Sequence, residues 1–597
     1  MTNQKEFFLS RITDFQKQIT RLRGKGRYVL MSRLVLFLSS VVVFALFIKT
    51  QPLLAWSTCA GVVVAFLILL KTETGALRQI NYLKNLIQVN ETEIELLEGR
   101  FENLDEGKEF TDKGHFFVSD LDIFGRRSLF QLLNRSSTQA GRTLLAQWLK
   151  NPLSGKNEIK LRQMAVRELS EKTEWRQQFS ALGKEKVDKN AETDRIYAWL
   201  SEENYFSNAF YAIVSWLFPL LTLAAIALYF SGILSSGTPL CFIIIQLLIS
   251  WLHAKKIGII HDVLSRKSEA IVKYQALISL IETDKFESNS LQMLQAKLRR
   301  DEEDASQSIR KLKTLVNALD SRMNIVVAFV LNGVLLWDIQ VVRHMESWRS
   351  KHKEDFLEWI DAIAGFDAFV SLAGYAGIHP DYTFPEIQPD DFLIDAQDIG
   401  HPMIEENRLV KNNYRIQGFS KTDLLTGANM AGKSTFLRTI GVNLCLAMIG
   451  APVCARAFRF SPVRLFTSLR TNDSLQENES FFYAELRRLH LLIQSYEQGE
   501  PVFFLLDEIL KGTNSKDQHL GAVALTKKIL RLKGVGIVAT HDVELSKLSD
   551  EFPGQVRNLC FEITIENDKL NFDYTLREGV CRTMNASFLM KKMGIID

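Results

Sequence analysis

The chain has 597 residues, of which 47% are apolar and 24% are charged, and its formal net charge is +3. These values are ordinary for globular proteins, so they exclude a disordered chain, a collagen-like fibre and a disulfide scaffold. The six cysteines show no paired CxxC spacing, so the sequence predicts neither a zinc site nor a disulfide framework. The small net charge neither requires nor excludes nucleic acid as a partner.

The N-terminal part contains two charge-free runs, Leu34–Ile48 and Pro52–Leu70. Each is close to the ~20 residues that span a bilayer, if the first helix begins at 28–33. We therefore expect a transmembrane hairpin at about 29–70.

Apolar residues at alternating spacings of three and four lie on both sides of this hairpin, at 8–22 and 80–101. Both segments are heptad seams, and the second has Asn90 at one core position. They predict an antiparallel helical stalk. The alternative is two separate amphipathic helices packed on the body of the protein.

A second run, Asn204–Leu252, contains no Asp, Glu, Lys, Arg or His. Ala209–Phe230 makes one span with a kink expected at Pro219, and a shorter span follows from Pro239 towards Ala254. A soluble core helix rarely stays apolar on every face for this length. We therefore expect a second membrane hairpin at about 209–254, although two buried core hairpins are the alternative.

Basic residues flank both hairpins, whereas the connecting turns contain only Lys49. By the positive-inside rule, both hairpins enter the membrane and return, and the large polar segments stay on the cytoplasmic side. The flanking residues are Arg21, Arg23, Lys25, Arg27, Arg33, Lys71, Arg78, His253, Lys255 and Lys256.

The sequence predicts that the middle of the chain is helical. Residues 256–322 form a long helical stretch whose apolar stripe is broken by the acidic run Asp301–Asp304. Residues 356–375 form another apolar-rich helix. Strand signals become frequent only after residue 380, with glycine turns between helices, so the C-terminal part is predicted to be an α/β domain.

A G-x-x-x-x-G-K-[ST] loop lies in this C-terminal part. Its residues are Gly427, Ala428, Asn429, Met430, Ala431, Gly432, Lys433, Ser434 and Thr435. A strand-like segment precedes the loop and a helical one follows, which is the context in which backbone N–H groups converge on phosphate oxygens. Lys433 is expected to reach the β- and γ-phosphates of a nucleotide, and Ser434 to supply a hydroxyl to Mg²⁺.

Two further strand ends complete this prediction. The apolar run 502–506 ends in Asp507 and Glu508, which places two carboxylates beside the phosphate loop at the same edge of a parallel sheet. Asp507 is expected to hold Mg²⁺, and Glu508 to polarise the attacking water. The run 536–540 ends at His541, which could sense the γ-phosphate.

These motifs resemble those of the MutS family. The similar segments are TGANMAGKST around Lys433, LLDEILKGTNSKD around Glu508, ATHDVEL around His541 and the segment Ser480–Glu485. Upstream, residues 121–153, followed by 161–163, resemble the start of the family's helical lever domain, and His401–Glu405 resembles its approach to the ATPase. The resemblance covers roughly 118–200 and 355–597.

The resemblance implies that Ser480 contacts the nucleotide of a partner subunit, so that the ATPase domains form a homodimer. It also implies DNA as the ligand and mismatch repair as the process. Phe588 falls where the family places a residue near adenine. The first 117 residues leave no room for the family's mismatch-reading domain, and the Phe-x-Glu at Phe356–Glu358 is interpreted as packing.

The predicted fold is therefore an α/β P-loop NTPase domain of the ABC/MutS type at 371–597, preceded by an all-α lever at 118–370 and by heptad helices at 1–117. We expect a multi-pass protein of a bacterial inner membrane, with a cytoplasmic ATPase that uses ATP and Mg²⁺. One alternative is an ABC-type transport or mechanotransmission ATPase, although no Leu-Ser-Gly-Gly-Gln signature is present. The other is a nucleotide-controlled membrane scaffold without DNA binding.

Overall fold

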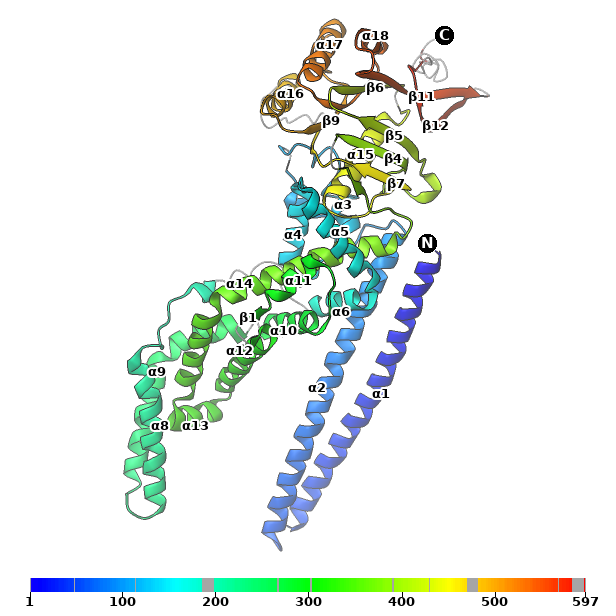
Figure 1. Ribbon diagram of the computed structural model, residues 1–597. Helices are drawn as coiled ribbons and strands as arrows, with labels where there is room; N and C mark the ends of the chain where they lie inside the picture. Colours follow the sequence, from blue (N-terminus) through cyan, green and yellow to red (C-terminus); the bar gives the residue numbers. More distant parts are fainter. Residues whose placement is uncertain are drawn as a thin grey trace.

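The computed structural model describes residues 2–47, 49–112, 114–184, 198–265, 268–300, 303–388, 391–428, 430–469, 481–566, 569–581 and 595. The two larger β-sheets lie at one end of the molecule and the lever helices in the middle (Figure 1). Two long helical hairpins project from the lever on the side away from the sheets (Figure 1).

The first hairpin is made of α1 (Thr2–Phe47) and α2 (Pro52–Leu97), which run antiparallel and side by side within one chain (Figure 1). Ile19, Ile80, Leu83 and Leu86 are buried in one cluster, so the heptad seams form the antiparallel stalk that the sequence predicts. Nearer the tip, Arg33 of α1 pairs with Glu73 of α2.

The sequence-distal half of α2 also packs on α6 (Thr173–Gly183). Asn90, the polar residue of the heptad seam, is fully buried there. Its Oδ1 accepts a hydrogen bond of 2.9 Å from the Gln177 side chain of α6. The stalk is therefore anchored on the lever as well, so that features of both expected arrangements are present.

The lever is built from helices that lie before and after the second hairpin in the chain. They are α3 (Leu129–Leu133), α4 (Gln139–Lys150), α5 (Lys156–Glu171), α6, α10 (Ser268–Thr283), α11 (Asn289–Ala296), α12 (Ala305–Asp320), the 3₁₀ turn Ser321–Met323, α13 (Ile325–Leu335) and α14 (Trp337–Ile378). The long helix α14 crosses the whole lever and packs on α4, α5 and α12.

Two features of the lever correspond to predictions made from the sequence, the helical stretch 256–322 and the packing of Phe356. The helical stretch expected at 256–322 consists of several helices, and a short hairpin of β1 (Arg299–Arg300) with β2 (Glu303–Asp304) lies at the acidic run. Phe356 is buried beside Trp359 within α14, so the interpretation of its Phe-x-Glu as packing is confirmed.

The second hairpin consists of α8 (Ala209–Phe230) and α9 (Gly237–Ser265), and α9 is longer than expected. Pro219 lies inside α8, where it cannot donate the usual bond to the carbonyl four residues earlier. That carbonyl, of Ser215, accepts a hydrogen bond of 2.9 Å from the Gln340 side chain of α14. Among the described residues, four helices are long and apolar enough to cross a membrane, or up to five if the bent pair α12–α13 is one span.

The C-terminal part contains two sheets. The larger has the order β12-β11-β6-β10-β9-β8, in which all neighbours are parallel except β11 and β12. Its strands are β6 (Lys421–Gly427), β8 (Arg464–Ser468), β9 (Val502–Asp507), β10 (Val535–Thr540), β11 (Val556–Glu566) and β12 (Lys569–Glu578). The central strands are buried on both faces, as in parallel sheets covered by helices.

The smaller sheet has the order β3-β7-β4-β5, from β3 (Glu386–Ile387), β4 (Leu393–Ile399), β5 (Asn412–Gln417) and β7 (Ala457–Phe460). The helices of this region are α15 (Lys433–Met448), α16 (Phe481–Glu497), α17 (Ser515–Arg531) and α18 (Leu548–Glu551). The mixed α/β character expected after residue 380 and the helical character before it are both confirmed.

Candidate nucleotide site

The phosphate loop connects the end of β6 to the first turn of α15. Gly432 has φ +104°, a conformation that side-chain-bearing residues rarely adopt. A Cβ on Gly432 would also approach the ring of Tyr574 to 3.1 Å. Met430 has a positive φ as well and is 79% exposed. The loop is therefore fixed in a shape that leaves the N-terminus of α15 open to an anion.

Lys433 is buried in this loop. Its Nζ donates hydrogen bonds to the carbonyls of Gly427, at 2.5 Å, and Ala428, at 3.1 Å. Burial lowers the pKa of Lys433, although the nearby carboxylates of Glu508 and Asp507 counteract this effect. The ammonium group is thus held where phosphate oxygens could replace two neutral carbonyls as stronger, charged partners.

Asp507 lies at the end of β9, which pairs with β10, and β10 pairs with β6. This order brings Asp507 beside the phosphate loop, where its Oδ2 accepts a hydrogen bond from the Ser434 hydroxyl. Burial raises the pKa of Asp507. Its Oδ1 is buried and has no hydrogen-bond partner among the described residues.

These two residues fit a magnesium ion. A hydroxyl and a carboxylate in contact, with one buried carboxylate oxygen unpaired, are oxygen ligands of the kind that Mg²⁺ binds together with substrate phosphates. No group of three or more His, Cys, Asp or Glu residues that could hold a metal occurs in the described part of the chain. The hydroxyl and the carboxylate therefore match an ion that is held together with the phosphates of a nucleotide.

Glu508 follows directly and adopts a positive φ of +49°. Its N–H donates to the carbonyl of Ala539 at 2.8 Å, and its Oε2 lies 2.8 Å from Nζ of Lys511 and 3.7 Å from Nδ1 of His541. Burial acts to raise the pKa of Glu508, but the hydrogen bond and charge of Lys511, with His541 and Lys433, outweigh it and lower the pKa. Glu508 is thus held as a carboxylate.

The segment after Glu508 is tied to α16. Leu510 also has a positive φ, and its N–H donates to Oε1 of Glu485 at 2.6 Å. Burial raises the pKa of Glu485. Strained residues of this kind persist where the surroundings over-determine them. The beginning of α16, which follows Ser480 in the chain, is therefore coupled to the Glu508 turn.

Three predicted residues lie outside the described residues: Asn429, Ser480 and Phe588. The others are brought together at one sheet edge. A cavity of about 650 Å³ opens from this edge and is lined by Lys433, Ser434, Thr435 and Glu508 together with Arg408–Val410, Phe436 and Tyr574. Its apolar and aromatic part could hold a nucleobase while the loop holds phosphates.

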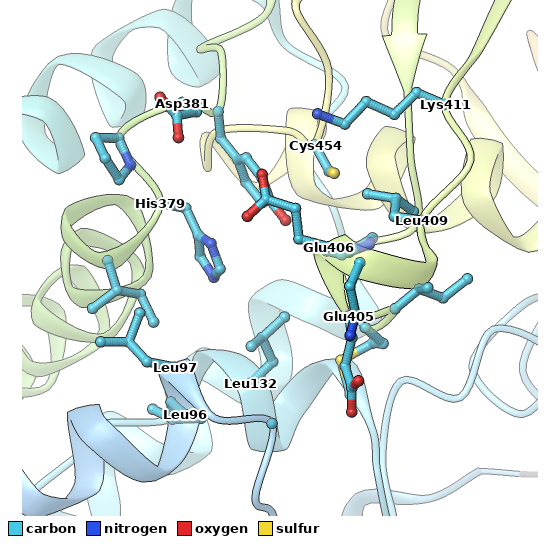
Figure 2. Close-up of a pocket in the computed structure, with 18 of the residues that line it drawn as sticks. Leu96, Leu97, Leu132, His379, Asp381, Glu405, Glu406, Leu409, Lys411 and Cys454 are labelled. Carbon is cyan, nitrogen blue, oxygen red and sulfur yellow. The ribbon is translucent and has the colours of Figure 1, made fainter. Parts of the chain in front are cut away.

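A second cavity, of about 890 Å³, shares Met403, Glu405 and Leu409 with the first. Figure 2 shows that Leu96 and Leu97 of α2 face it from one side, and Lys411 and Cys454 from the other. His379, which follows α14, also lines it. The stalk, the lever and the ATPase region therefore meet directly beside the nucleotide site.

Two site residues were not predicted. Lys511 belongs to the recognised LLDEILKGTNSKD segment, so its position three residues after Glu508 could have indicated the ion pair. Tyr574 lies on β12, far from the loop in sequence, and its approach to Gly432 has no local sequence signal. Its carbonyl accepts a hydrogen bond of 3.0 Å from the Asn412 side chain.

Comparison with known proteins agrees with this geometry. The family model described as MutS domain III matches residues 117–373, and that described as MutS domain V matches residues 423–592. The chain belongs to the MutS family. The matched domain V begins in β6 and includes the phosphate loop, Asp507, Glu508 and His541.

Curated MutS-family relatives are similar to part of this chain. The DNA mismatch repair protein MutS of Thermotoga maritima is 32% identical over 251 residues, which are 41% of this chain and 31% of that protein. DNA mismatch repair protein MutS 2 of Halobacterium salinarum is 33% identical over 238 residues (39% and 27%), and MSH4 of Arabidopsis thaliana 31% over 216 (36% and 27%). The chain spans less than a third of the length of these relatives.

Proposed function

We propose that this protein is a membrane-anchored, MutS-type ATPase that binds and hydrolyses ATP with Mg²⁺ as a dimeric switch. The observation that supports it most is the convergence of Lys433, Ser434, Asp507, Glu508 and His541 at one sheet edge. Each has the chemistry that a phosphate-cleaving site requires.

The residues divide the work as follows. Lys433 and the N–H groups of the loop bind the β- and γ-phosphates. Ser434 and Asp507 would hold the ion, which when bound would neutralise charge on the phosphates. Glu508, kept ionised by Lys511, orients water and accepts its proton as the water oxygen attacks the γ-phosphorus and the bond to ADP breaks. His541, beside the same carboxylate, responds to the presence of the γ-phosphate.

A dimer would complete this site. The phosphate loop is at the surface, with Met430 exposed, and the turn after Glu508 is tied through Glu485 to the segment that follows Ser480. In the family resemblance, that serine contacts the partner subunit's nucleotide. We propose that ATP joins two ATPase domains and that hydrolysis releases them, which moves the levers.

The membrane anchor is supported by composition and by arrangement. The candidate spans form two hairpins that project on the same side of the lever (Figure 1). The freed carbonyl at Pro219 is satisfied by Gln340, as every backbone group within lipid must be. We propose that both hairpins enter one bilayer and that the ATPase domain lies on its cytoplasmic side.

DNA is the proposed ligand of the levers, because the relatives named above are DNA mismatch repair proteins. A duplex that binds to the levers would stimulate ATP hydrolysis, with binding that weakens steeply as salt rises. Stimulation only by vesicles that carry a solute would instead favour a transport ATPase. If neither DNA nor such vesicles stimulate ATP hydrolysis, that result would favour the nucleotide-controlled scaffold.

The assigned role of Glu508 in ATP hydrolysis is tested by Glu508→Gln, which removes the proton acceptor but keeps the shape of the side chain. We expect ATP hydrolysis to fall by about 10²–10³-fold, while ATP binding is retained. Glu544→Gln, at an exposed glutamate that pairs with Lys547, is the matched control and should leave both unchanged. Unchanged turnover in Glu508→Gln would refute the assigned role.

A further inference from the structure

The short helix α13 exposes an apolar surface that the proposed function does not use. The run from Met323 to Trp337 contains no charged residue, but α13 has only 11 residues, about 16 Å, which is too short to cross a bilayer. Ile325 is 85% exposed and Phe329 61%. The large side chains exposed on this surface are Met323, Ile325, Val326, Val327, Phe329 and Val330.

The C-terminal end of α13 is fastened to the second hairpin. A Cβ on Gly333 would lie 3.1 Å from the Ile243 side chain of α9, so the two helices approach closely. The Gln246 side chain of α9 donates to the Val334 carbonyl of α13 at 3.4 Å and also to the Thr222 hydroxyl of α8. α13 therefore belongs to the same packed unit as α8 and α9.

The position of this contact along the hairpin determines the depth of α13. Gln246 lies nine residues before Lys255, the first charged side chain of the positive segment on α9 apart from His253. At the helical rise, this separation is about 13 Å. If the lysine lies at the headgroups, Gln246 and the end of α13 lie within the acyl chains of the cytoplasmic leaflet, whose thickness is about 15 Å.

At both ends of α13, side chains accept hydrogen bonds from backbone N–H groups, which lowers the cost of placing these groups among acyl chains. The Asn324 side chain accepts hydrogen bonds from the N–H groups of Val326 and Val327, at 3.1 and 3.3 Å, so that part of the first turn is capped. At the other end, the Asn332 side chain accepts from the Asp338 N–H at 3.0 Å, and Leu336 takes a left-handed conformation that turns the chain into α14.

Charged groups mark both sides of the insertion. Before α13, Asp320 pairs with His261 at 2.9 Å, and after it Asp338 lies 3.8 Å from Arg322. The chain bends by 113° between α12 and α13. The chain is therefore polar before α13, apolar along it and polar again after it, which is the pattern of a short segment that enters a membrane without crossing it.

We infer that α13 is a lipid-inserted helix that lies in the cytoplasmic leaflet beside α8 and α9. This inference rests on the proposed membrane anchor and adds a third point of contact, made by the lever itself. Lipid is the occupant, rather than a second copy of this chain, because α13 packs on α9, whose side chains Leu240, Ile244 and Leu248 are likewise exposed and apolar. Apart from the capping residue Asn324, the exposed side chains of this surface are apolar, whereas protein interfaces carry paired polar groups at their rim.

The experiment measures whether acyl chains touch α13. The full-length protein, with its accessible cysteines Cys59, Cys241 and Cys581 replaced, carries one new cysteine labelled with the fluorophore NBD. The proteins are reconstituted into phosphatidylcholine vesicles with and without nitroxide-labelled acyl chains. Val326→Cys reports on α13, and Val330→Cys replaces it if the first variant does not fold.

Two matched positions separate the possible outcomes. Leu220→Cys, on the exposed face of α8, reports on the anchor itself, and Leu520→Cys, at an exposed leucine of α17, reports on the water-exposed ATPase region. We expect acyl-chain quenching at 326 comparable to that at 220, and none at 520.

Quenching at 220 but not at 326 would overturn the inference and leave the proposed anchor standing. In that case a blue-shifted, unquenched signal at 326 would indicate cover by protein, and a red-shifted one contact with water. The absence of quenching at both positions would overturn the membrane anchor together with this inference.

Discussion

The stalk is joined to the lever through a buried ion pair that a single added methyl group should break. Arg135 donates from Nε and Nη2 to the Glu93 carboxylate of α2, each at 2.9 Å, and from Nη1 to the carbonyls of Leu132 and Leu133. Gly374 of α14 lies against it. A Cβ there would be 2.1 Å from Cδ of Arg135, so Gly374→Ala must displace the guanidinium.

The expected cost follows from these contacts. Breaking a buried pair by removing one partner costs about 3–5 kcal/mol, because the other charge stays buried and uncompensated. Alanine is favoured over glycine in a helix by up to about 1 kcal/mol. The net loss of about 2–4 kcal/mol corresponds to an opening equilibrium that is ~30 to ~10³ times more favourable.

Hydrogen exchange measured by mass spectrometry on the intact protein would report this opening in α3 and in the last turns of α2. The control is Gly75→Ala, on the same helix α2 whose exchange is measured, because a Cβ at Gly75 meets nothing within 4 Å. It should leave exchange unchanged or slightly slower. If Gly374→Ala exchanges at the wild-type rate in both segments, the guanidinium has room to move and the reasoning is wrong.

Two further predictions concern titration. Lys511→Met removes the main group that lowers the pKa of Glu508 against the effect of burial, so the acid limb of kcat against pH should move to higher pH. An unmoved limb would exclude Lys511 from this role. Burial lowers the pKa of His401 to about 4, against about 6.5 in the unfolded chain. As the pH falls from about 6.5 to about 4, the unfolded state therefore binds more protons than the folded state. The free energy of unfolding then declines by up to about 1.4 kcal/mol per pH unit. In His401→Asn, the asparagine side chain can still accept the hydrogen bond that the Met403 N–H donates to His401. The thermal midpoint of this variant should depend less on pH between about 7 and 5 than that of the wild type. An equal dependence would count against the assignment of this effect to His401.

The parts that could be predicted from sequence are those with local signals. The phosphate loop is specified by the spacing of Gly427, Gly432 and Lys433, and the carboxylates by their place after an apolar strand. The heptad seams likewise predict the pairing of α1 and α2. In each case, the pattern that determines the structure lies within one short segment.

The remaining features depend on contacts between distant segments. Asn90 looks like a coiled-coil core position, but its partner is Gln177 on another helix. The run from Met323 to Trp337 is charge-free but too short for a span, and its composition does not distinguish a buried helix from an exposed one. Tyr574 reaches Gly432 only because β12 folds back beside β11 at the sheet edge. Periodicity in one segment does not report such partners.

The length of α14 has a mechanical consequence. It is a single helix of 42 residues that begins next to α13 and ends at Ile378, beside the cavity that adjoins the nucleotide site. At the helical rise it is about 63 Å long, so a tilt of only about 5° at the ATPase end would displace the other end by about 5 Å. Small rearrangements around a nucleotide would thereby be amplified to about one helical turn at the level of the hairpins.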